Sequence, residues 1–394
     1  MTTINHEPIR DRARLATTAL PTAADLDLAI ANVLARIDRT LPDFTDQFPA
    51  PSSEGLVYPA IGNIEWTNGF WTGMLWLAYE LTGEARYRAA AETQVRSFLD
   101  RAEQRINVAH HDLGFLYTPS ACAALRLTGD ADARRAGLLA ADLLLERFDP
   151  VSGVIQAWGD LNDPAEAGRM IIDCNLNLPL LYWATAQTGD AKYRDAAEHH
   201  LTQAARYLVR ADASTFHTFH MDTATGAPLR GTTHQGHGDD SCWARGQAWG
   251  IYGFALGYAH SGREALVGLS ASLANYFLNR LPDDLVCRWD LIFTDGDAPA
   301  DTSAAAIAAC GLLELVRHLP ASDPDRDLYT NAAWGMVRRL DADHLAPLHG
   351  SNGVLAHGVY HMPKRIGVNE CCIWGDYFHL EALVRLRRVW RPYW

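Results

Sequence analysis

Hydrophobic and polar residues recur along this chain in a pattern that predicts pairs of helices. Three similar segments begin at Leu77, Ala123 and Trp183, and each is read as a helix, a Thr-Gly step and a second helix. The glycine suits the left-handed position that ends a helix, and apolar residues then return at helical spacing. A fourth copy begins at Gly257 and has Ser-Gly at the step. The repeat therefore predicts helical hairpins.

The two helices of each predicted pair differ in composition. The first is apolar all round and rich in aromatic and small residues, with expected starts near Trp71, Phe115, Cys174, Trp243, Thr302 and Trp374. The second is more charged and amphipathic, at about residues 24–39, 84–101, 130–147, 190–209, 262–280 and 324–340. A helix that is apolar all round is buried, whereas an amphipathic helix covers a surface. Six inner helices within six outer ones predict an all-α fold, an (α/α)6 toroid.

A closed ring is favoured over an open stack of helical pairs, because the inner helices start at uneven intervals and long loops separate them. One domain, residues 1–394, then covers the chain, and residues 1–22 are expected to form an extended N-terminal arm. Strand signals are weak, so "GVIQAW" and "TFHMD" are expected to form only short hairpin pieces.

Charge and composition narrow the classes of function. A formal net charge of −13 without a basic run argues against nucleic acid and anionic membranes as partners. The N-terminal residues lack the apolar core of a secretory signal, and no apolar run reaches the roughly 18 residues of a membrane span. The seven cysteines are an odd number without a C-x-x-C pair, which favours reduced thiols. We therefore expect a soluble, cytoplasmic protein without a zinc site.

Polar and aromatic side chains cluster at the predicted starts of the inner helices. If these helices all run the same way, their first turns lie on one face of the ring. The side chains there are Trp66, Asn68, His111, Asp112, Arg169, Asp173, His234, Gln235, Asp239, Asp240, Arg245, Trp249, Asp301, Asn369, Glu370 and Asp376. Indoles offer stacking faces, and amides, imidazoles and guanidinium groups bind hydroxyls and carboxylates. This set is typical of a sugar pocket.

Two acids in this set are candidates for chemistry. Asp173 lies in "RMIIDCNLNLPLLYWA", where its neighbours are almost wholly apolar. Burial raises the pKa of a carboxyl group, so Asp173 is expected to be protonated at neutral pH and to act as a general acid. The alternative is a buried aspartate bonded to a helix terminus. Asp112, in "HHDLGF", also suits a helix N-cap, which is its structural alternative.

The segment from Thr233 to Tyr258 is the richest in functional groups. Arg245 and Trp249 lie where a helix begins, and the structural alternative for Arg245 is an ion pair with Asp239 or Asp240. Those two acids lack partner carboxylates at a recognisable metal-binding spacing, so neither a metal nor a cofactor is predicted. His217 and His220 are left open between substrate contacts and stacked loop residues.

Five segments together resemble glycoside hydrolase family 88, the unsaturated glucuronyl hydrolases. They are "HHDLGF", "MIIDCNLNLPLLYWA", "HQGHGDDSCWARGQAWGIYGF", "DTSAAAIAACGLLEL" and "NECCIWGDYFHLEAL", and the resemblance spans Trp66 to Leu383. It implies an (α/α)6 barrel that acts on oligosaccharides left by polysaccharide lyases, whose terminal uronic acid carries a C4=C5 double bond. The implied chemistry is hydration of a vinyl ether, so the carboxylate-spacing rule of ordinary glycosidases does not apply.

The resemblance also implies roles for individual residues. Asp173 would protonate C4 and then accept a proton from the attacking water, and Asp112 would stabilise the developing charge and keep Asp173 protonated. The implied substrate contacts are Trp66, His111, Trp158, His217, Gln235, Arg245 and Trp249. Among these, Arg245 is expected to pair with the uronate carboxylate, because guanidinium matches that planar anion. Lys364 and Arg365 are expected near a sulfate or second carboxylate in the next subsite.

The expected partner is an unsaturated uronic-acid oligosaccharide, and the oligomeric state is left open between monomer and homodimer. Three other functions compete with this one. They are an unsaturated rhamnogalacturonyl hydrolase of family 105, a sugar 2-epimerase on the same barrel with paired histidines, and a helical-repeat adaptor. An adaptor has no need of acids buried among aromatic residues.

Overall fold

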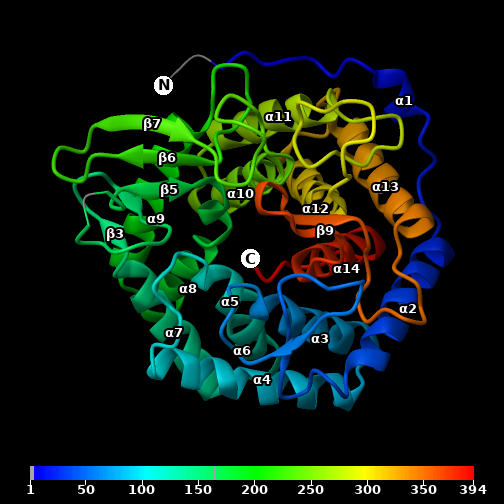
Figure 1. The fold of residues 1–394 in the computed structure, drawn as a ribbon, viewed down its shortest axis with the longest axis horizontal. Helices are drawn as coiled ribbons and strands as arrows, with labels where there is room; N and C mark the ends of the chain where they lie inside the picture. Colours follow the sequence, from blue (N-terminus) through cyan, green and yellow to red (C-terminus); the bar gives the residue numbers. More distant parts are fainter. Residues whose placement is uncertain (1–3, 164) are drawn as a thin grey trace.

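Within the part of the chain that the structure describes, six inner helices form a ring at the centre, and six outer helices surround them (Figure 1). The computed structural model describes residues 4–163 and 165–394. The inner helices are α3 (Asn68–Thr82), α5 (Leu113–Tyr117) continued through a π-helical turn into α6 (Ala123–Thr128), α8 (Pro179–Thr188), α10 (Ala244–Ser261), α12 (Thr302–His318) and α14 (Ile373–Arg387). The outer helices are α2 (Ala23–Thr40), α4 (Ala85–Glu103), α7 (Ala131–Leu145), α9 (Ala191–Gln203), α11 (Ala265–Leu278) and α13 (Arg326–Asp343). The predicted toroid is confirmed.

The ring is closed by contact between its first and last inner helices. Helix α10 packs on α12, α12 on α14, and α14 on α3, which follows α2 at the start of the chain. Every residue of α10 from Ala244 to Gly257 is buried, whereas buried and exposed residues alternate around α4. This difference is the physical reason for the two compositions, because an inner helix meets protein on all sides.

Glycines end the inner helices at the predicted steps. Gly83, Gly129, Gly189 and Gly262 have φ values of 72°, 74°, 77° and 70°, and each donates its N–H to the carbonyl four residues earlier. Positive φ is easily reached only without a Cβ atom. The chain therefore turns sharply from inner to outer helix at each of these four positions.

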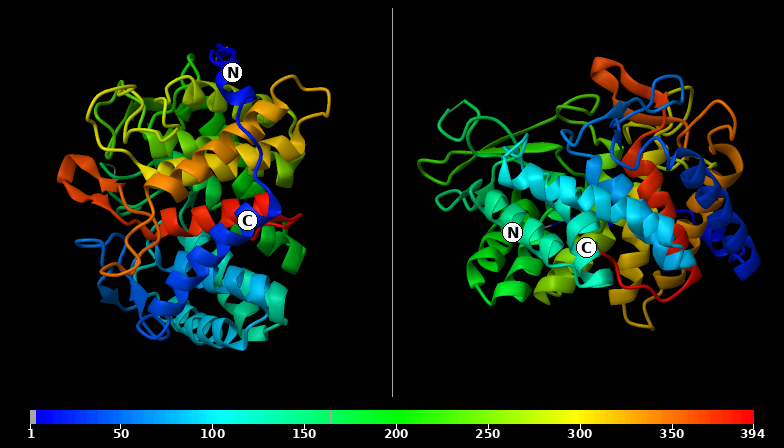
Figure 2. Two further views of the ribbon diagram at one scale, coloured as in Figure 1. Left: turned by 90° about the vertical axis from the view of Figure 1, so that its right-hand side faces the viewer. Right: turned by 90° about the horizontal axis from the view of Figure 1, so that it is seen from below.

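Short antiparallel strands lie at the other end of the ring, among the long loops that lead into the inner helices (Figure 2). They are β1 (Phe48–Pro49), β2 (Ala60–Ile61), β3 (Phe148–Asp149), β4 (Val154–Ile155), β5 (Arg169–Ile171), β6 (Thr218–Met221), β7 (Pro228–Thr232), β8 (Gly358–His361) and β9 (Ile366–Glu370). Strands β4 and β6 are the two predicted pieces. The sequence did not predict the β8–β9 hairpin, which adds side chains to the end of the ring where the inner helices begin.

The N-terminal residues run along the outside of the ring, past α11 and α13 (Figure 1). Glu7 pairs with Arg280, and the backbone N–H of Asn5 donates to Ala211. The short helix α1 (Arg12–Ala16) interrupts the otherwise extended arm, and Ile9 and Leu15 are buried. Among the described helices, none is both long and apolar enough to cross a membrane.

Candidate active site

A cavity of about 350 Å³ opens at the end of the ring where the inner helices begin. Seven of the nine predicted site residues line it, namely Trp66, His111, Asp112, Trp158, Asp173, His217 and Gln235. The cavity is also lined by His234 and Lys364, which the sequence placed nearby, and by Tyr360, His361 and Ile366, which it did not single out. Arg245 and Trp249 lie outside the lining. The cavity thus draws its walls from segments more than two hundred residues apart in the chain.

Asp112 occupies the N-cap position of α5, but its side chain makes no capping hydrogen bond. Asn177 supplies that bond instead, since its Oδ1 accepts from the backbone N–H of Phe115 at 2.7 Å. The backbone of Asn177 comes so close that a Cβ on Gly114 would lie 2.2 Å from its Cα, which explains the glycine of the motif. The helix start therefore positions Asp112 and leaves its carboxylate free for the cavity.

The rings of the two histidines before Asp112 both lie close to its carboxylate. His110 Nδ1 lies 3.2 Å from Oδ2, and His111 Nε2 lies 3.3 Å from Oδ1. His111 Nε2 also lies 3.4 Å from Oδ1 of Asp173. The imidazole of His111, which is buried, thus bridges the two acids, and one polar atom of each residue lies within 4.8 Å of the other two.

The two acids have opposite pKa shifts. Burial raises the pKa of Asp173 well above its usual range, and the negative charge of Asp112 raises it further. Burial also disfavours the charged form of Asp112, but the interactions with His111 and His110 outweigh it and lower the pKa of Asp112. Burial lowers the pKa of His111 to about 4, so that imidazole is neutral. The raised pKa of Asp173 favours its protonated form, and the lowered pKa of Asp112 favours the carboxylate, which together are the arrangement a general acid needs.

Three further histidines that line the cavity, His217, His234 and His361, are neutral hydrogen-bonding groups, because burial lowers the pKa of each. His217 Nδ1 accepts from the backbone N–H groups of His234, at 2.7 Å, and Gln235, at 3.3 Å. Burial lowers the pKa of His217 well below its usual value, so the ring carries a single proton. Since Nδ1 is the acceptor, that proton resides on Nε2. The His234 ring meets that of His361 edge to face, with centroids 4.9 Å apart. These rings offer directional contacts to a ligand without adding charge.

The indoles of the cavity are fixed in orientation. Trp66 stacks on Trp374 with ring centroids 5.2 Å apart, and its Nε1 donates to the hydroxyl of Tyr360 at 3.1 Å. Trp158 lies beneath the guanidinium of Arg169, 5.0 Å from the ring centroid. Rings held in this way provide flat apolar surfaces for a sugar. Because they are already immobilised, binding costs little side-chain entropy.

Arg245 lies behind the cavity wall, and its partner is Asp301. The guanidinium is 1% exposed and lies 3.4 Å from the Asp301 carboxylate, so the alternative pairing with Asp239 or Asp240 is wrong. It also donates to Gln235 Oε1 at 2.6 Å and to the carbonyl of Tyr360 at 2.8 Å. Because the amide oxygen of Gln235 is used by Arg245, its amide nitrogen remains available to donate to a ligand. The positive charge of Arg245 partly offsets the rise in the pKa of Asp173.

Trp249 belongs to the core beneath the site. Its side chain is buried, and its ring lies 5.1 Å from that of Phe115 and 5.4 Å from that of Phe378. Trp249 therefore packs beneath α5, the helix that begins after Asp112.

A buried arginine on α4 connects the loops that carry Trp66 and Asp112. Arg101 is 1% exposed and donates to the carbonyls of Glu65, at 2.9 Å, and Asn107, at 2.8 Å. It also donates to Asn63 Oδ1 at 2.9 Å and to the carbonyl of Ile106 at 3.1 Å. The sequence pattern gives no sign of this role, because an arginine in an amphipathic helix is usually exposed.

His111, Asp112 and Asp173 also form the one group of three potential metal ligands found within the described residues. Within this group the raised pKa of Asp173 favours its protonated form, and a protonated carboxyl group is a poorer metal ligand than a carboxylate.

Comparison with known proteins places the chain in a family. The model of Glycosyl Hydrolase Family 88 matches residues 37–343. This chain belongs to that family. It is 48% identical over 390 residues to the unsaturated chondroitin disaccharide hydrolase of Streptococcus pneumoniae, with 98% of each chain covered. Family membership decides against the rhamnogalacturonyl hydrolase, the epimerase and the adaptor.

Solved structures of family 88 agree with the fold described above. The crystal structure of unsaturated glucuronyl hydrolase from Streptococcus agalactiae superposes with a TM-score of 0.98 at 45% identity, with 100% of both chains covered. A mutant of that enzyme complexed with dGlcA-GalNAc6S superposes with a TM-score of 0.90 at 43% identity, covering 100% of this chain and 99% of the other. The chain is therefore a glycoside hydrolase with the toroid of its relatives.

Proposed function

We propose that the protein removes the 4,5-unsaturated glucuronyl residue from the non-reducing end of lyase-generated oligosaccharides. The observation that carries this proposal is the pair of acids in one cavity, with a proton held on Asp173 and a negative charge on Asp112. The cavity of about 350 Å³ suits a saccharide of one or two rings. Relatives at 45–48% identity carry the names unsaturated chondroitin disaccharide hydrolase and unsaturated glucuronyl hydrolase.

The first step adds a proton from Asp173 to C4 of the double bond. The electron pair of C4=C5 forms the new C4–H bond, and positive charge develops on C5 and the ring oxygen. The ionised Asp112 stabilises that charge electrostatically in a site where burial weakens screening by water. Asp173 is left as a carboxylate at this stage.

The second step adds water to C5. The Asp173 carboxylate accepts one proton of the water as its oxygen bonds to C5, which restores the protonated acid. The resulting hemiketal opens by cleavage of the bond between C5 and the ring oxygen. The hemiacetal left at C1 then collapses to an aldehyde and releases the neighbouring sugar. The sum is one water consumed for each glycosidic link broken.

The other lining residues bind and orient the substrate. Trp66 and Trp158 provide the stacking surfaces, and His111, His217 and the Gln235 amide nitrogen donate to ring oxygens or the carboxylate. Arg245 adds positive charge behind Gln235, and Trp249 packs below the site. Lys364, exposed in the lining, would meet an acidic group on the second sugar.

We further expect the reaction to need no metal and to take place in the cytoplasm. The seven cysteines are buried and none is in a disulfide, as a reducing compartment favours. Prolonged treatment with a chelator should leave turnover unchanged, and loss of turnover that an added divalent ion restores would refute metal independence.

The test of the proposed function follows the ultraviolet absorbance of the conjugated alkene in an unsaturated chondroitin disaccharide. The wild-type protein should remove that absorbance, and Asp173→Asn should not. Persistent absorbance with the wild type, across sulfated and unsulfated unsaturated disaccharides, would overturn the proposal.

A further inference from the structure

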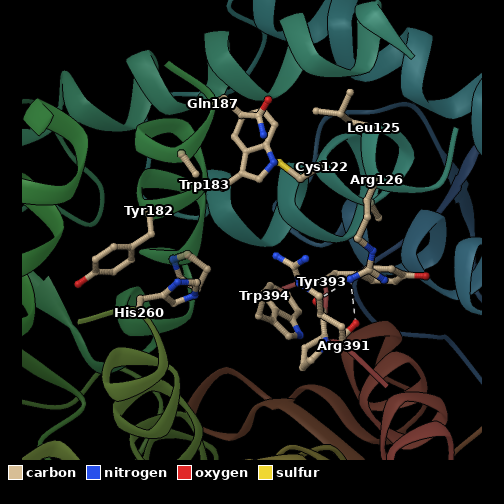
Figure 3. A pocket seen from close by; sticks show the side chains of 14 residues that line it. Cys122, Leu125, Arg126, Tyr182, Trp183, Gln187, His260, Arg391, Tyr393 and Trp394 are labelled. Carbon is tan, nitrogen blue, oxygen red and sulfur yellow. Dashed lines mark hydrogen bonds between the residues drawn. The ribbon is translucent and has the colours of Figure 1, made fainter. Parts of the chain in front are cut away.

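A second cavity, of about 330 Å³, lies at the opposite end of the barrel (Figure 3). It is bordered by α6 and α8, by His260 near the end of α10, and by residues 391–394 of the C-terminal tail, which begins at residue 388. Among the described residues that line it there is no aspartate or glutamate. Nothing in the mechanism above uses this cavity.

The tail that forms one wall is firmly anchored. The Tyr393 hydroxyl and Trp390 Nε1 both donate to Glu80 Oε2, at 2.6 and 3.0 Å, and Trp394 Nε1 donates to Glu381 at 2.8 Å. Arg126 adds two hydrogen bonds of 2.8 Å to the carbonyls of residues 391 and 392. The three aromatic side chains of the tail are buried. The tail is therefore held in a fixed position by the rest of the fold.

Arg391 is the exception within this anchored tail. Its side chain is exposed in the cavity, and its guanidinium has no hydrogen-bond or ion-pair partner among the residues that the structure describes. The other cation of the cavity is already compensated, because Arg126 lies 3.5 Å from Glu80 and binds the two tail carbonyls. A fixed wall thus presents one uncompensated positive charge to the cavity.

Figure 3 shows Trp183 and Gln187 on the other side of the cavity from Arg391, and the indole and amide groups of these residues are hydrogen-bond donors. Gln187 uses its Oε1 to accept from Arg134 at 3.2 Å, so its amide nitrogen remains available. The half-buried Trp183 has no partner for its indole N–H in the described structure, and its ring is fixed against Gly137, where a Cβ would lie 2.7 Å from it. A glycine N–H group caps one carbonyl near the end of each of α6, α8 and α10. The cavity therefore offers several donors, and no carboxylate in its described lining competes for them.

Aromatic surfaces complete the site. The His260 ring stacks on Tyr182 with centroids 4.8 Å apart and an interplanar angle of 6°. Aromatic faces next to amide and guanidinium donors suit a sugar ring with a carboxylate, because the rings pack on its C–H faces and the donors bind its oxygens. We propose that this cavity binds a small acidic sugar of the uronate class, with Arg391 pairing with the carboxylate and Trp183 and Gln187 donating to hydroxyls. This site stands on its own donors and does not depend on the proposed function.

The test uses the indole N–H resonance of Trp183 in a proton–nitrogen correlation spectrum of the whole protein. Trp183→Phe identifies that resonance, and the resonances of Trp66 and Trp158 report separately on the candidate active site. Titration with D-glucuronate should shift the Trp183 resonance saturably. Arg391→Met should raise the dissociation constant read at Trp183 about tenfold, because it removes a charge-assisted contact. Arg338→Met, on the outer helix α13, is the matched control and should leave that constant unchanged.

Two further probes make the outcome decisive. D-glucose, which has the same ring without a carboxylate, should shift the Trp183 resonance much less than D-glucuronate, and benzoate should also bind more weakly. Equal binding of glucose, tighter binding of benzoate, or no effect of Arg391→Met would each overturn the proposal. A shift at Trp66 and Trp158 without one at Trp183 would overturn it too, and would leave the uronate site of the proposed function intact.

Discussion

The two ends of the barrel differ in how the chain connects its helices. Where inner helices lead into outer ones the steps are short: α3 ends at Thr82 and α4 begins at Ala85, and α8 ends at Thr188 before α9 begins at Ala191. Where outer helices lead into inner ones the connections are long and carry the strands. Long connections supply side chains for a site, so the candidate active site formed at that end. At the other end, the C-terminal tail adds side chains to the second cavity.

The two cavities also differ in their acids. The first contains two carboxyl groups whose pKa values move in opposite directions, because burial and mutual repulsion act on one and imidazole contacts act on the other. The second is lined by donors and cations, and its described lining includes no carboxyl group. A cavity needs a proton that can move near neutral pH to do acid–base chemistry, whereas it needs only complementary groups to bind. The comparison predicts chemistry at one end and binding alone at the other.

The largest expected effect is the loss of turnover in Asp173→Asn. We expect kcat to fall about a thousandfold, since the variant keeps the shape of the carboxyl group but cannot give up a proton. The response of Trp183 to D-glucuronate should be the same as in the wild type. Asp195→Asn, on the exposed side of α9, is the control. The roles assigned to the two ends would be wrong if Asp173→Asn kept more than about a tenth of the activity.

Next in size is the effect of Asp112→Asn on the pH dependence. Turnover needs Asp173 protonated and Asp112 ionised, so activity is lost at high pH through Asp173 and at low pH through Asp112. The charge of Asp112 helps to raise the pKa of Asp173. Removing that charge lowers the pKa of Asp173, so the basic limb of kcat/KM should move to lower pH while kcat falls about a hundredfold. A basic limb that stays in place would show that Asp112 does not tune Asp173.

Arg101→Met tests whether the buried arginine positions the first cavity. The change leaves several carbonyls near Trp66 and Asp112 without donors, so we expect about 3 kcal/mol of lost stability and a roughly tenfold lower kcat/KM. A purely structural role would lower the melting temperature and leave the kinetics of the remaining folded protein unchanged. Arg96→Met, on the exposed face of the same helix, should change neither quantity. Binding of D-glucuronate at Trp183 should persist in Arg101→Met.

The smallest expected effect concerns Lys364. This lysine is exposed, so its ion pair with a sulfate on the second sugar would be worth at most about 1 kcal/mol. Lys364→Met should raise KM for a 6-sulfated unsaturated disaccharide about fivefold and leave kcat unchanged. Lys192→Met is the matched control, because Lys192 is an exposed lysine on the outer helix α9 and does not line the cavity. A similar rise in KM for the unsulfated disaccharide would contradict a contact with sulfate.

The helical pattern was predictable because it depends on the residues of short, continuous segments. The outer helix expected at residues 24–39 spans Ala23–Thr40, and the inner helix expected at Thr302 begins there. Apolar spacing and a glycine step act within a few residues, so they can be read along the chain. The β8–β9 hairpin could not be read in this way. Its strands are short and depend on cross-strand pairing, with a register shift between Gly358 and Val359.

Within the candidate active site, the two acids were the most predictable part. The apolar neighbours of Asp173 indicated burial directly, and the "HHDLGF" segment placed Asp112 at a helix start. The partner of Arg245 was not predictable, because Asp301 is 56 residues away and meets it only when α10 and α12 pack together. Arg101 was hidden for a similar reason, since the loops that bury it lie on either side of α4 in the sequence.

The sequence by itself determined the helical repeat and the apolar surroundings of Asp173, because each depends on residues close together in the chain. Only the tertiary structure decided that Asn177 caps the helix that Asp112 begins, that Arg245 is held by Asp301, and that the tail presents Arg391 to a second cavity. The physical reason is that hydrogen-bond partners and burial depend on which distant segments meet when the ring closes.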